Sequence, residues 1–400
     1  MPQPISTVSR DHDRYVESAR LQALPPYIFA QLDALKAQAR ERGVDVIDLG
    51  MGNPDRPTPP AVLEAAGLAL QDPANHRYPT FDGRQELRTA IAAWYQARYG
   101  VALDPEREVL PLIGSKEGLA HLALAYINPG DVSLVPSPSY PVHTRGTILA
   151  GGHIETLPLS AETDWQVDFD AIPMDAARRA RLMFFNYPNN PTAATAERGL
   201  FERAVTFARD TETLLVHDMA YAELAFDGFR PTSLLEIPGA RDYGVEFHTF
   251  SKTFSMAGWR VGFVVGNARM IQALLKVKSN MDYGLFPVVQ HAAMAALRLP
   301  AGEVQSIVDM YRSRRDILVD GLRGIGFDVK RPRATMYVWV PVPTGYTSAT
   351  FASRLIDEAG VVVTPGTAFG ACGEGYVRMS LIVPPERLQE ATARLAAVSW

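Results

Sequence analysis

The chain has 400 residues, of which 47% are apolar and 21% are charged, an ordinary composition for a soluble globular protein. This length has room for two or three folding units and a substantial core. The net charge of −5 argues against nucleic acid or an anionic membrane as the main partner.

Several classes of site and location are excluded by simple patterns. Cys372 is the only cysteine, so neither an internal disulfide nor a cysteine zinc site can form. The eight histidines contain no H-E-x-x-H pair, and we expect no metal. Neither a signal peptide nor a membrane-spanning apolar run is found, so a cytoplasmic enzyme is expected.

The N-terminal part of the chain leads from polar sequence into regular elements. The first ten residues are polar and are expected to be loose. An apolar face between Tyr27 and Arg42 predicts a helix, which Gly43 ends. Residues 44–49 alternate as a short strand. The Gly- and Pro-rich residues 50–60 predict a rigid loop at a domain crossing or the edge of an active site.

Helix and strand patterns then alternate, which predicts a mainly parallel sheet with helices on both faces. The expected strands are Val109–Ile113, Val132–Val135, Leu182–Phe185, Leu214–His217, Phe247–Phe250 and Val261–Val265.

The pattern changes after about residue 290. A long helix is expected over Gly302–Leu322, followed by strands Met336–Val340 and Tyr376–Ile382 around a helix over Thr350–Ala359. We therefore predict a large α/β domain over residues 51–290 and a smaller α+β domain over residues 291–400. Residues 1–50 are expected to pack with the smaller domain.

Polar residues follow the predicted strands, where open α/β sheets bind ligands. Ser115 and Lys116 come directly after a strand and begin a helix, a position that suits a phosphate. An ordinary N-cap serine is the alternative. Tyr140, in a Pro-stiffened loop, could stack on a flat heterocycle or pack at the edge of the core.

Two further loops carry amide and carboxylate groups. Asn190 lies in a Pro/Asn turn and could donate to a phenolate oxygen, although most such turns are only turns. Asp218 ends an apolar strand, and Tyr221 follows three residues later. A buried carboxylate needs a cation, which a protonated pyridine nitrogen would supply. A helix N-cap is the alternative for Asp218.

Lys252 lies between hydroxyl residues, with Thr249 and Ser251 before it and Arg260 eight positions after it. A lysine in a folded site can form a Schiff base with an aldehyde, while the hydroxyls and the arginine could hold a phosphate. Pyridoxal phosphate carries both groups. The alternative is a surface turn between two strands. Arg378 on a late strand could bind a substrate carboxylate, or could be an ordinary solvated arginine.

From about Asp48 to its C-terminus the chain resembles the class I/II, fold-type I aminotransferases that depend on pyridoxal phosphate. The bacterial alanine (glutamate–pyruvate) and LL-diaminopimelate aminotransferases are the most similar groups. The resemblance rests on the lysine motif and on the segments Met51-Gly52-Asn53-Pro54-Asp55, Gly114-Ser115-Lys116-Glu117-Gly118 and His217-Asp218-Met219-Ala220-Tyr221.

The resemblance implies a role for each candidate residue. Lys252 would be the Schiff-base lysine, Asp218 the pyridinium partner and Tyr140 the stacking ring. Asn190 and Tyr221 would contact the phenolate oxygen. Substrate would meet Arg378, Asn190 and the backbone of Gly52. The phosphate would be held by Ser115, Lys116, Thr249, Ser251 and Arg260. Members are typically homodimers, in which Tyr78 would reach the neighbouring subunit's phosphate.

The resemblance also implies ping-pong amino transfer between an amino acid and a 2-oxo acid. An alanine/glutamate type is the main expectation, LL-diaminopimelate the alternative, and a C–S lyase the rival of another class. A cofactor-binding regulator is disfavoured because the chain has no basic N-terminal DNA-binding segment. Ala193 stands where many relatives have glycine, so we expect a differently shaped turn there. Tyr27, Asp282 and Tyr283 are candidates for the substrate side-chain pocket.

Overall fold

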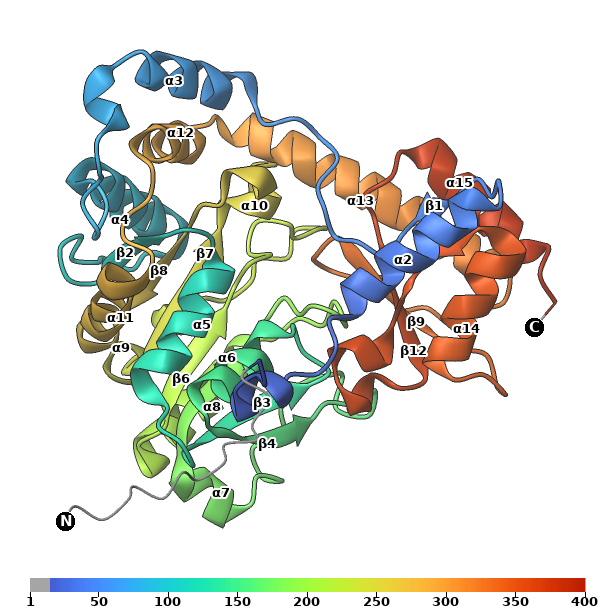
Figure 1. Ribbon diagram of the computed structural model, residues 1–400, viewed down its shortest axis with the longest axis horizontal. Coiled ribbons are helices and arrows are strands. Elements are labelled where there is room, and N and C mark those ends of the chain that lie inside the picture. The colour runs from blue at the N-terminus through green and yellow to red at the C-terminus, as the bar shows by residue number, and fades with distance from the viewer. Residues whose placement is uncertain (1–14, 400) are drawn as a thin grey trace, which may run out of the picture.

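The computed structural model describes residues 15–399, so the expectation for the first ten residues lies outside the described part. A seven-stranded sheet forms the large domain, in the order β2-β8-β7-β6-β5-β3-β4 (Figure 1). β8 alone runs opposite to the other six strands, which confirms the mainly parallel sheet. The strands are β2 Val109–Leu112, β3 Val132–Ser137, β4 His153–Pro158, β5 Ala180–Phe185, β6 Leu214–Asp218, β7 Gly244–Thr249 and β8 Gly262–Gly266.

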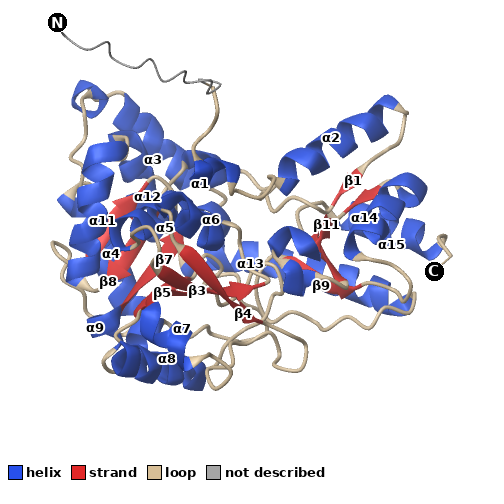
Figure 2. Ribbon diagram, turned by 60° about the horizontal axis from the view of Figure 1, so that its bottom comes forward, coloured by secondary structure: helices blue, strands red, loops and turns tan. Residues whose placement is uncertain are grey.

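Helices cover both faces of this sheet (Figure 2). Alternate residues of β5 show why: Met183 and Phe185 pack in one apolar cluster with residues of α8, whereas Leu182 and Phe184 pack in another with residues of α5. The helices of this part are α3 Pro60–Leu70, α4 Gln85–Tyr99, α5 Ser115–Tyr126, α6 Val142–Ala150, α7 Met174–Arg179, α8 Arg198–Thr211, α9 Ala240–Tyr243, α10 Phe250–Thr253, α11 Ala268–Met281 and α12 Pro287–Leu297.

A smaller α+β unit lies beside the large domain (Figure 1). Its antiparallel sheet has the order β11-β12-β9, formed by Thr364–Pro365, Tyr376–Ser380 and Tyr337–Pro341. β1, Ile47–Asp48, pairs in parallel with β10, Val361–Val362, and so brings an early segment to this unit. The helices are α2 Ile28–Glu41, α13 Ala301–Gly324, α14 Ser348–Arg354 and α15 Pro385–Ala396, and a short α1, Ala19–Gln22, lies near α6.

Short helical turns complete the described chain. They have 3₁₀ geometry over Pro73–His76, Leu234–Glu236, Ala257–Trp259, Gly366–Phe369 and Ala371–Gly373, and π geometry over Leu355–Ala359. In residues 15–399, no helix combines the length and the apolar character that crossing a membrane requires.

Two expectations about elements were wrong in detail, and one strand was missed. The strand over residues 44–49 shrinks to Ile47–Asp48, and β4 was not predicted because its edge position leaves most of its residues exposed or half-buried. Phe250 does not end a strand but begins α10. Thr249 causes this change, because its hydroxyl accepts a hydrogen bond from the Ser251 N–H at 3.1 Å and caps the helix that carries Lys252.

A buried polar network holds β6 to β7. The Glu246 carboxylate accepts hydrogen bonds from His217 Nδ1 and the Leu234 N–H on one oxygen, and from the Tyr95 hydroxyl and His248 Nε2 on the other, at 2.7–2.8 Å. Burial raises the pKa of Glu246, but the two histidines outweigh it and the pKa is lowered. Since His217 precedes Asp218, this network fixes the strand end where the site begins.

Glu246→Ala should lower the free energy of unfolding by about 3–5 kcal/mol, because it leaves buried donors without an acceptor. Urea unfolding of the cofactor-free protein measures this loss. Glu202→Ala removes an exposed glutamate paired with Arg198 and should change the unfolding free energy by less than about 0.5 kcal/mol. Equal losses for the two variants would contradict the role given to the network.

Candidate active site

A cavity of about 430 Å³ lies at the carboxyl ends of β5, β6 and β7, where the smaller unit's β9 and β12 meet them. Of the cofactor, catalytic and substrate candidates that the sequence singles out, all but Tyr78, Asp282 and Tyr283 line this cavity. The candidates that line it are Gly52, Ser115, Lys116, Tyr140, Asn190, Asp218, Tyr221, Thr249, Ser251, Lys252, Arg260 and Arg378.

Asp218 presents a buried carboxylate to this cavity. Its Oδ2 lies 3.1 Å from Nε2 of His143, on α6, while Oδ1 has no hydrogen-bond partner among the described residues. The Asn186 side chain donates to the Asp218 carbonyl at 2.7 Å and holds the strand end. An unsatisfied buried carboxylate oxygen is costly, so the site fits a cationic donor such as a protonated pyridine nitrogen.

Lys252 reaches the cavity from α10. Its Nζ donates a hydrogen bond to the Gly52 carbonyl at 2.6 Å, which brings the loop after β1 against the lysine. Burial lowers the pKa of Lys252, and the positive charges of Arg378 and Arg260 lower it further. The amine therefore loses its proton at a lower pH than an exposed lysine, as a nucleophile or base requires.

The start of α5 forms an anion site with the segment around the lysine. Gly114, at φ 82°, precedes the helix, so the N–H groups that begin at Ser115 are free of earlier helical turns. A Cβ at Gly114 would lie 2.7 Å from Nη2 of Arg260, so glycine lets the guanidinium reach this helix end. The Thr249 and Ser251 hydroxyls, 3.0 Å apart, border the same cavity. This donor set fits a phosphate.

Arg378 is fully buried and joins the two halves of the cavity. Its guanidinium donates to Oδ1 of Asn190 and to the Gly50 carbonyl, both at 2.7 Å. Its central carbon also lies 4.1 Å from the centre of the Tyr337 ring. A buried guanidinium fixed in this way presents a planar cation to a carboxylate.

The turn that carries Asn190 contains a strained alanine. Ala193 adopts φ 58°, a left-handed conformation that glycine tolerates better, and its N–H donates to the Asn189 carbonyl at 3.0 Å. The Asn190 N–H donates to the Asn186 side chain at 2.8 Å. The backbone thus keeps a positive φ at this position without glycine.

Aromatic side chains form the walls of the cavity. The Tyr221 hydroxyl donates to the Tyr337 hydroxyl at 3.1 Å, and burial raises the pKa of both Tyr140 and Tyr221. Tyr27 also lines the cavity, with the Lys116 Nζ 5.4 Å from its ring centre. The Lys116 ammonium therefore lies at the wall formed by the N-terminal segment.

Sequence reasoning missed three residues of the site. His143 and Asn186 support Asp218, and Tyr337 lines the cavity beside Tyr221. His143 is the second residue of α6 and belongs to no motif that the sequence analysis used. Asn186 carried a usable signal, because it comes directly after the apolar strand β5.

Tyr78 lies away from this cavity. It is 89% exposed and borders a second cavity of about 930 Å³ formed mainly by α3, α12 and the residues before α4. Its ring meets Tyr283 edge-on at 5.5 Å between centres, and Phe81 meets Tyr283 at 6.1 Å. Tyr283 and Asp282 are thus outside the first cavity in the single chain.

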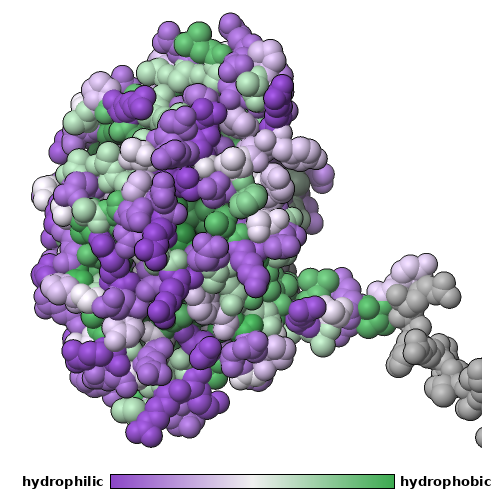
Figure 3. All heavy atoms as spheres, turned by 90° about the vertical axis from the view of Figure 1, so that its left-hand side faces the viewer, coloured by the Kyte–Doolittle hydropathy of each residue, from purple (hydrophilic) through white to green (hydrophobic). Residues whose placement is uncertain are grey.

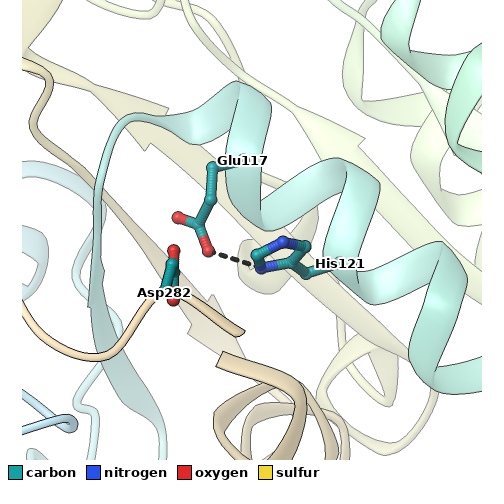
Figure 4. Close-up of side chains that lie close together, drawn as sticks. All are labelled: Glu117, His121 and Asp282. Atoms are coloured by element: carbon teal, nitrogen blue, oxygen red, sulfur yellow. Dashed lines mark ion pairs between the residues drawn. The ribbon is translucent and has the colours of Figure 1, made fainter. Parts of the chain in front are cut away.

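Asp282 belongs instead to a charge cluster between α5 and α11 (Figure 4). Glu117 lies 2.8 Å from Nδ1 of His121, and the buried Lys278 ammonium lies 3.1 Å from Asp282 and 3.5 Å from Glu117. The position that a metal would take between the carboxylates thus faces a lysine cation. We interpret the group as an ion-pair network that ties the two helices together.

Known proteins resemble this chain along most of its length. The family described as "Aminotransferase class I and II" matches residues 44–395. The LL-diaminopimelate aminotransferase of Desulforudis audaxviator is 54% identical over 95% of this chain and 97% of its own. The enzyme with the same name from Syntrophobacter fumaroxidans is 52% identical over 96% of this chain and all of its own. The substrate-bound structure of BacF from Bacillus subtilis superposes with a TM-score of 0.92 at 38% identity, covering 95% and 97% of the two chains.

Lys252→Ala should remove the visible absorbance that the protein acquires with pyridoxal phosphate, because Lys252 supplies the buried amine beside Gly52, whereas the Lys116 amine packs over the Tyr27 ring. Lys276→Ala, which changes an exposed lysine on α11, should leave the band unchanged. Absorbance spectra of the two purified variants after incubation with the cofactor test this assignment. A visible band that survives in Lys252→Ala would show that another amine bonds the aldehyde.

Proposed function

The chain belongs to the class I and II aminotransferases, and we propose that its amino donor is LL-diaminopimelate. It is a pyridoxal-phosphate-dependent aminotransferase. The proposal for the donor rests on one observation, the identity of 54% and 52% to two LL-diaminopimelate aminotransferases along nearly the whole chain. The comparisons therefore favour the alternative expectation over the alanine/glutamate type.

The cofactor supplies an electron-accepting ring, and the residues of the cavity would hold it and move protons around it. Asp218 would keep the ring nitrogen protonated, with His143 holding the second carboxylate oxygen. Ser115, Thr249, Ser251 and Arg260 would hold the phosphate, with Lys116 as a further cation. Tyr140 would stack on the ring, and Asn190 and Tyr221 would donate to its phenolate oxygen.

Lys252 would do the proton transfer. In the absence of substrate, its amine would hold the cofactor at the aldehyde group. With substrate bound, this amine, whose pKa is lowered by burial, would be the base that moves the proton of the substrate α-carbon. Release of one 2-oxo acid and reaction with a second would complete a ping-pong cycle.

Arg378 would set the direction in which the substrate lies. Its guanidinium would bind the α-carboxylate, while Asn190 and the Gly52 backbone border that position. LL-diaminopimelate carries an amino and a carboxylate group at both ends, so its far end would extend toward other polar groups of the cavity.

A cytoplasmic location of the protein stays a prediction.

A panel of amino donors tests the substrate. In single-turnover reactions the cofactor's absorbance should change fastest with LL-diaminopimelate, and its kcat/KM should exceed those of lysine and alanine by roughly 100-fold or more. Polar groups left unpaired in a site give discrimination of this size. Lysine is the matched control because it lacks only the distal carboxylate.

Equal or faster reaction with alanine would overturn the proposal in favour of the alanine/glutamate type. The C–S lyase remains the rival of another class, and cystathionine separates it from transfer. Pyruvate and ammonia without a 2-oxo acid acceptor would indicate lysis. Glutamate formed from LL-diaminopimelate and 2-oxoglutarate would indicate transfer.

We also propose that the protein is a homodimer with shared sites. Apolar side chains are exposed on α3 and on the loops around residues 78–81 and 281–286, and Figure 3 shows this side with green groups among the polar residues. A second copy would cover this apolar face and bring Tyr78 to the partner's phosphate. The exposed members are Leu63, Leu68, Leu70, Tyr78, Phe81, Met281, Tyr283 and Phe286.

Mixing two inactive variants tests the sharing of sites. Tyr78→Ala and Lys252→Ala should each lose activity, and co-refolded chains should regain about a quarter of the wild-type rate, because half of the dimers are hybrids with one intact site. Sedimentation of each variant checks that it still dimerises. No recovery from dimeric mixtures would contradict the proposed position of Tyr78.

A further inference from the structure

Tyr337 lines the cavity between Tyr221 and Gly52. It is buried at the start of β9, and its hydroxyl accepts a hydrogen bond from the Tyr221 hydroxyl at 3.1 Å. A Cβ placed on Gly52 would lie only 1.9 Å from the Tyr337 oxygen. Since the Gly52 carbonyl accepts from Lys252, the Tyr337 hydroxyl lies beside the reacting amine.

The backbone around Tyr337 is held in a strained conformation. Thr335 adopts φ 76°, a left-handed conformation that is rare for a β-branched residue. Its hydroxyl accepts from the Tyr337 N–H at 3.2 Å, and its N–H donates to the Leu224 carbonyl at 2.8 Å. Leu224 in turn donates to the Tyr221 carbonyl at 3.1 Å, so the two tyrosines are attached to one connected piece of backbone.

The positive charges around Tyr337 make its hydroxyl lose its proton more readily. Burial raises its pKa, but Arg378 from β12 and Lys252 from α10 outweigh burial and lower it. The other titratable groups around it are tyrosines, and burial raises the pKa of Tyr221, Tyr140 and Tyr311.

We propose that Tyr337 is a positioning residue that acts through Tyr221. When the Tyr221 proton turns to the phenolate oxygen of the cofactor, the Tyr337 hydroxyl reverses its direction and donates to the Tyr221 oxygen. Two hydroxyls in series polarise one another, so this second hydrogen bond makes Tyr221 a stronger donor. The inference rests on the proposed roles of Lys252 and Tyr221, and it holds whichever amino acid is the substrate.

The test is a pH titration of the visible band of the cofactor-loaded protein without substrate. A donor to the phenolate oxygen stabilises its negative charge, so losing the donor raises the pH at which the lysine-bound cofactor gives up its proton. Tyr221→Phe should raise this midpoint. Tyr337→Phe should raise it by a smaller amount, roughly 0.2–0.5 pH units, because it only weakens the donor.

The double variant separates positioning from independent action. Tyr221→Phe combined with Tyr337→Phe should have the midpoint of Tyr221→Phe alone, because Tyr337 has no hydroxyl left to act on. Tyr311→Phe is the matched control, since it removes a buried hydroxyl on α13 that has no hydrogen-bond partner in the described chain. An unchanged midpoint in Tyr337→Phe, or fully additive shifts, would overturn the inference.

A second measurement decides the matter if Tyr337→Phe does not take up cofactor. In the cofactor-free protein, ultraviolet difference spectra should show that the tyrosine lost in Tyr337→Phe ionises at lower pH than the one lost in Tyr311→Phe, because the Tyr337 hydroxyl accepts from Tyr221 and its ring lies against the Arg378 guanidinium. Equal titrations of the two variants would overturn the inference. Absence of the visible band in wild type would instead refute the cofactor assignment itself.

Discussion

The site depends on keeping a carboxylate buried at the end of a strand with one oxygen unsatisfied. Removing Asp218 from water is tolerable only because His143 and the strand-end hydrogen bonds hold it, and the remaining oxygen favours a bound cation. Strand alternation turns the preceding residue, His217, to the opposite face, where Glu246 receives it. One strand end therefore carries both the network that fixes the backbone and the group that selects the cofactor.

Much of the large domain could be predicted from the sequence because its signals are local. Apolar runs bounded by turns predicted six of the seven strands, and polar residues directly after them predicted the lining of the cavity. Lys252 was recognised from its neighbours, but its helix was not, because the cap that starts α10 uses a threonine that also suits a strand. Tyr283 was expected near the substrate, whereas in the single chain its ring packs against Tyr78, a contact that only the packing of two loops decides.

Two of the supporting residues, Tyr337 and His143, could not be predicted in this way. Tyr337 lies in a run of apolar residues that is typical of any buried strand, and its importance comes from contacts with Gly52 and Tyr221, which are far apart in the chain. His143, on α6, likewise owes its importance to a contact with Asp218, which is far away in the chain. Contacts between distant segments leave no periodic mark in a single sequence. The sequence therefore predicted the candidate catalytic residues, but it did not predict Tyr337 and His143, which hold them in position.

The contact between Gly52 and Tyr337 has a consequence for how such chains diverge. Any side chain at position 52 would collide with the Tyr337 hydroxyl, and the same loop must keep its carbonyl on Lys252. Neither position can change alone without moving the other segment. Substitutions at positions 52 and 337 are therefore expected to occur together among homologous proteins. An alignment of these proteins should show covariation between the two positions.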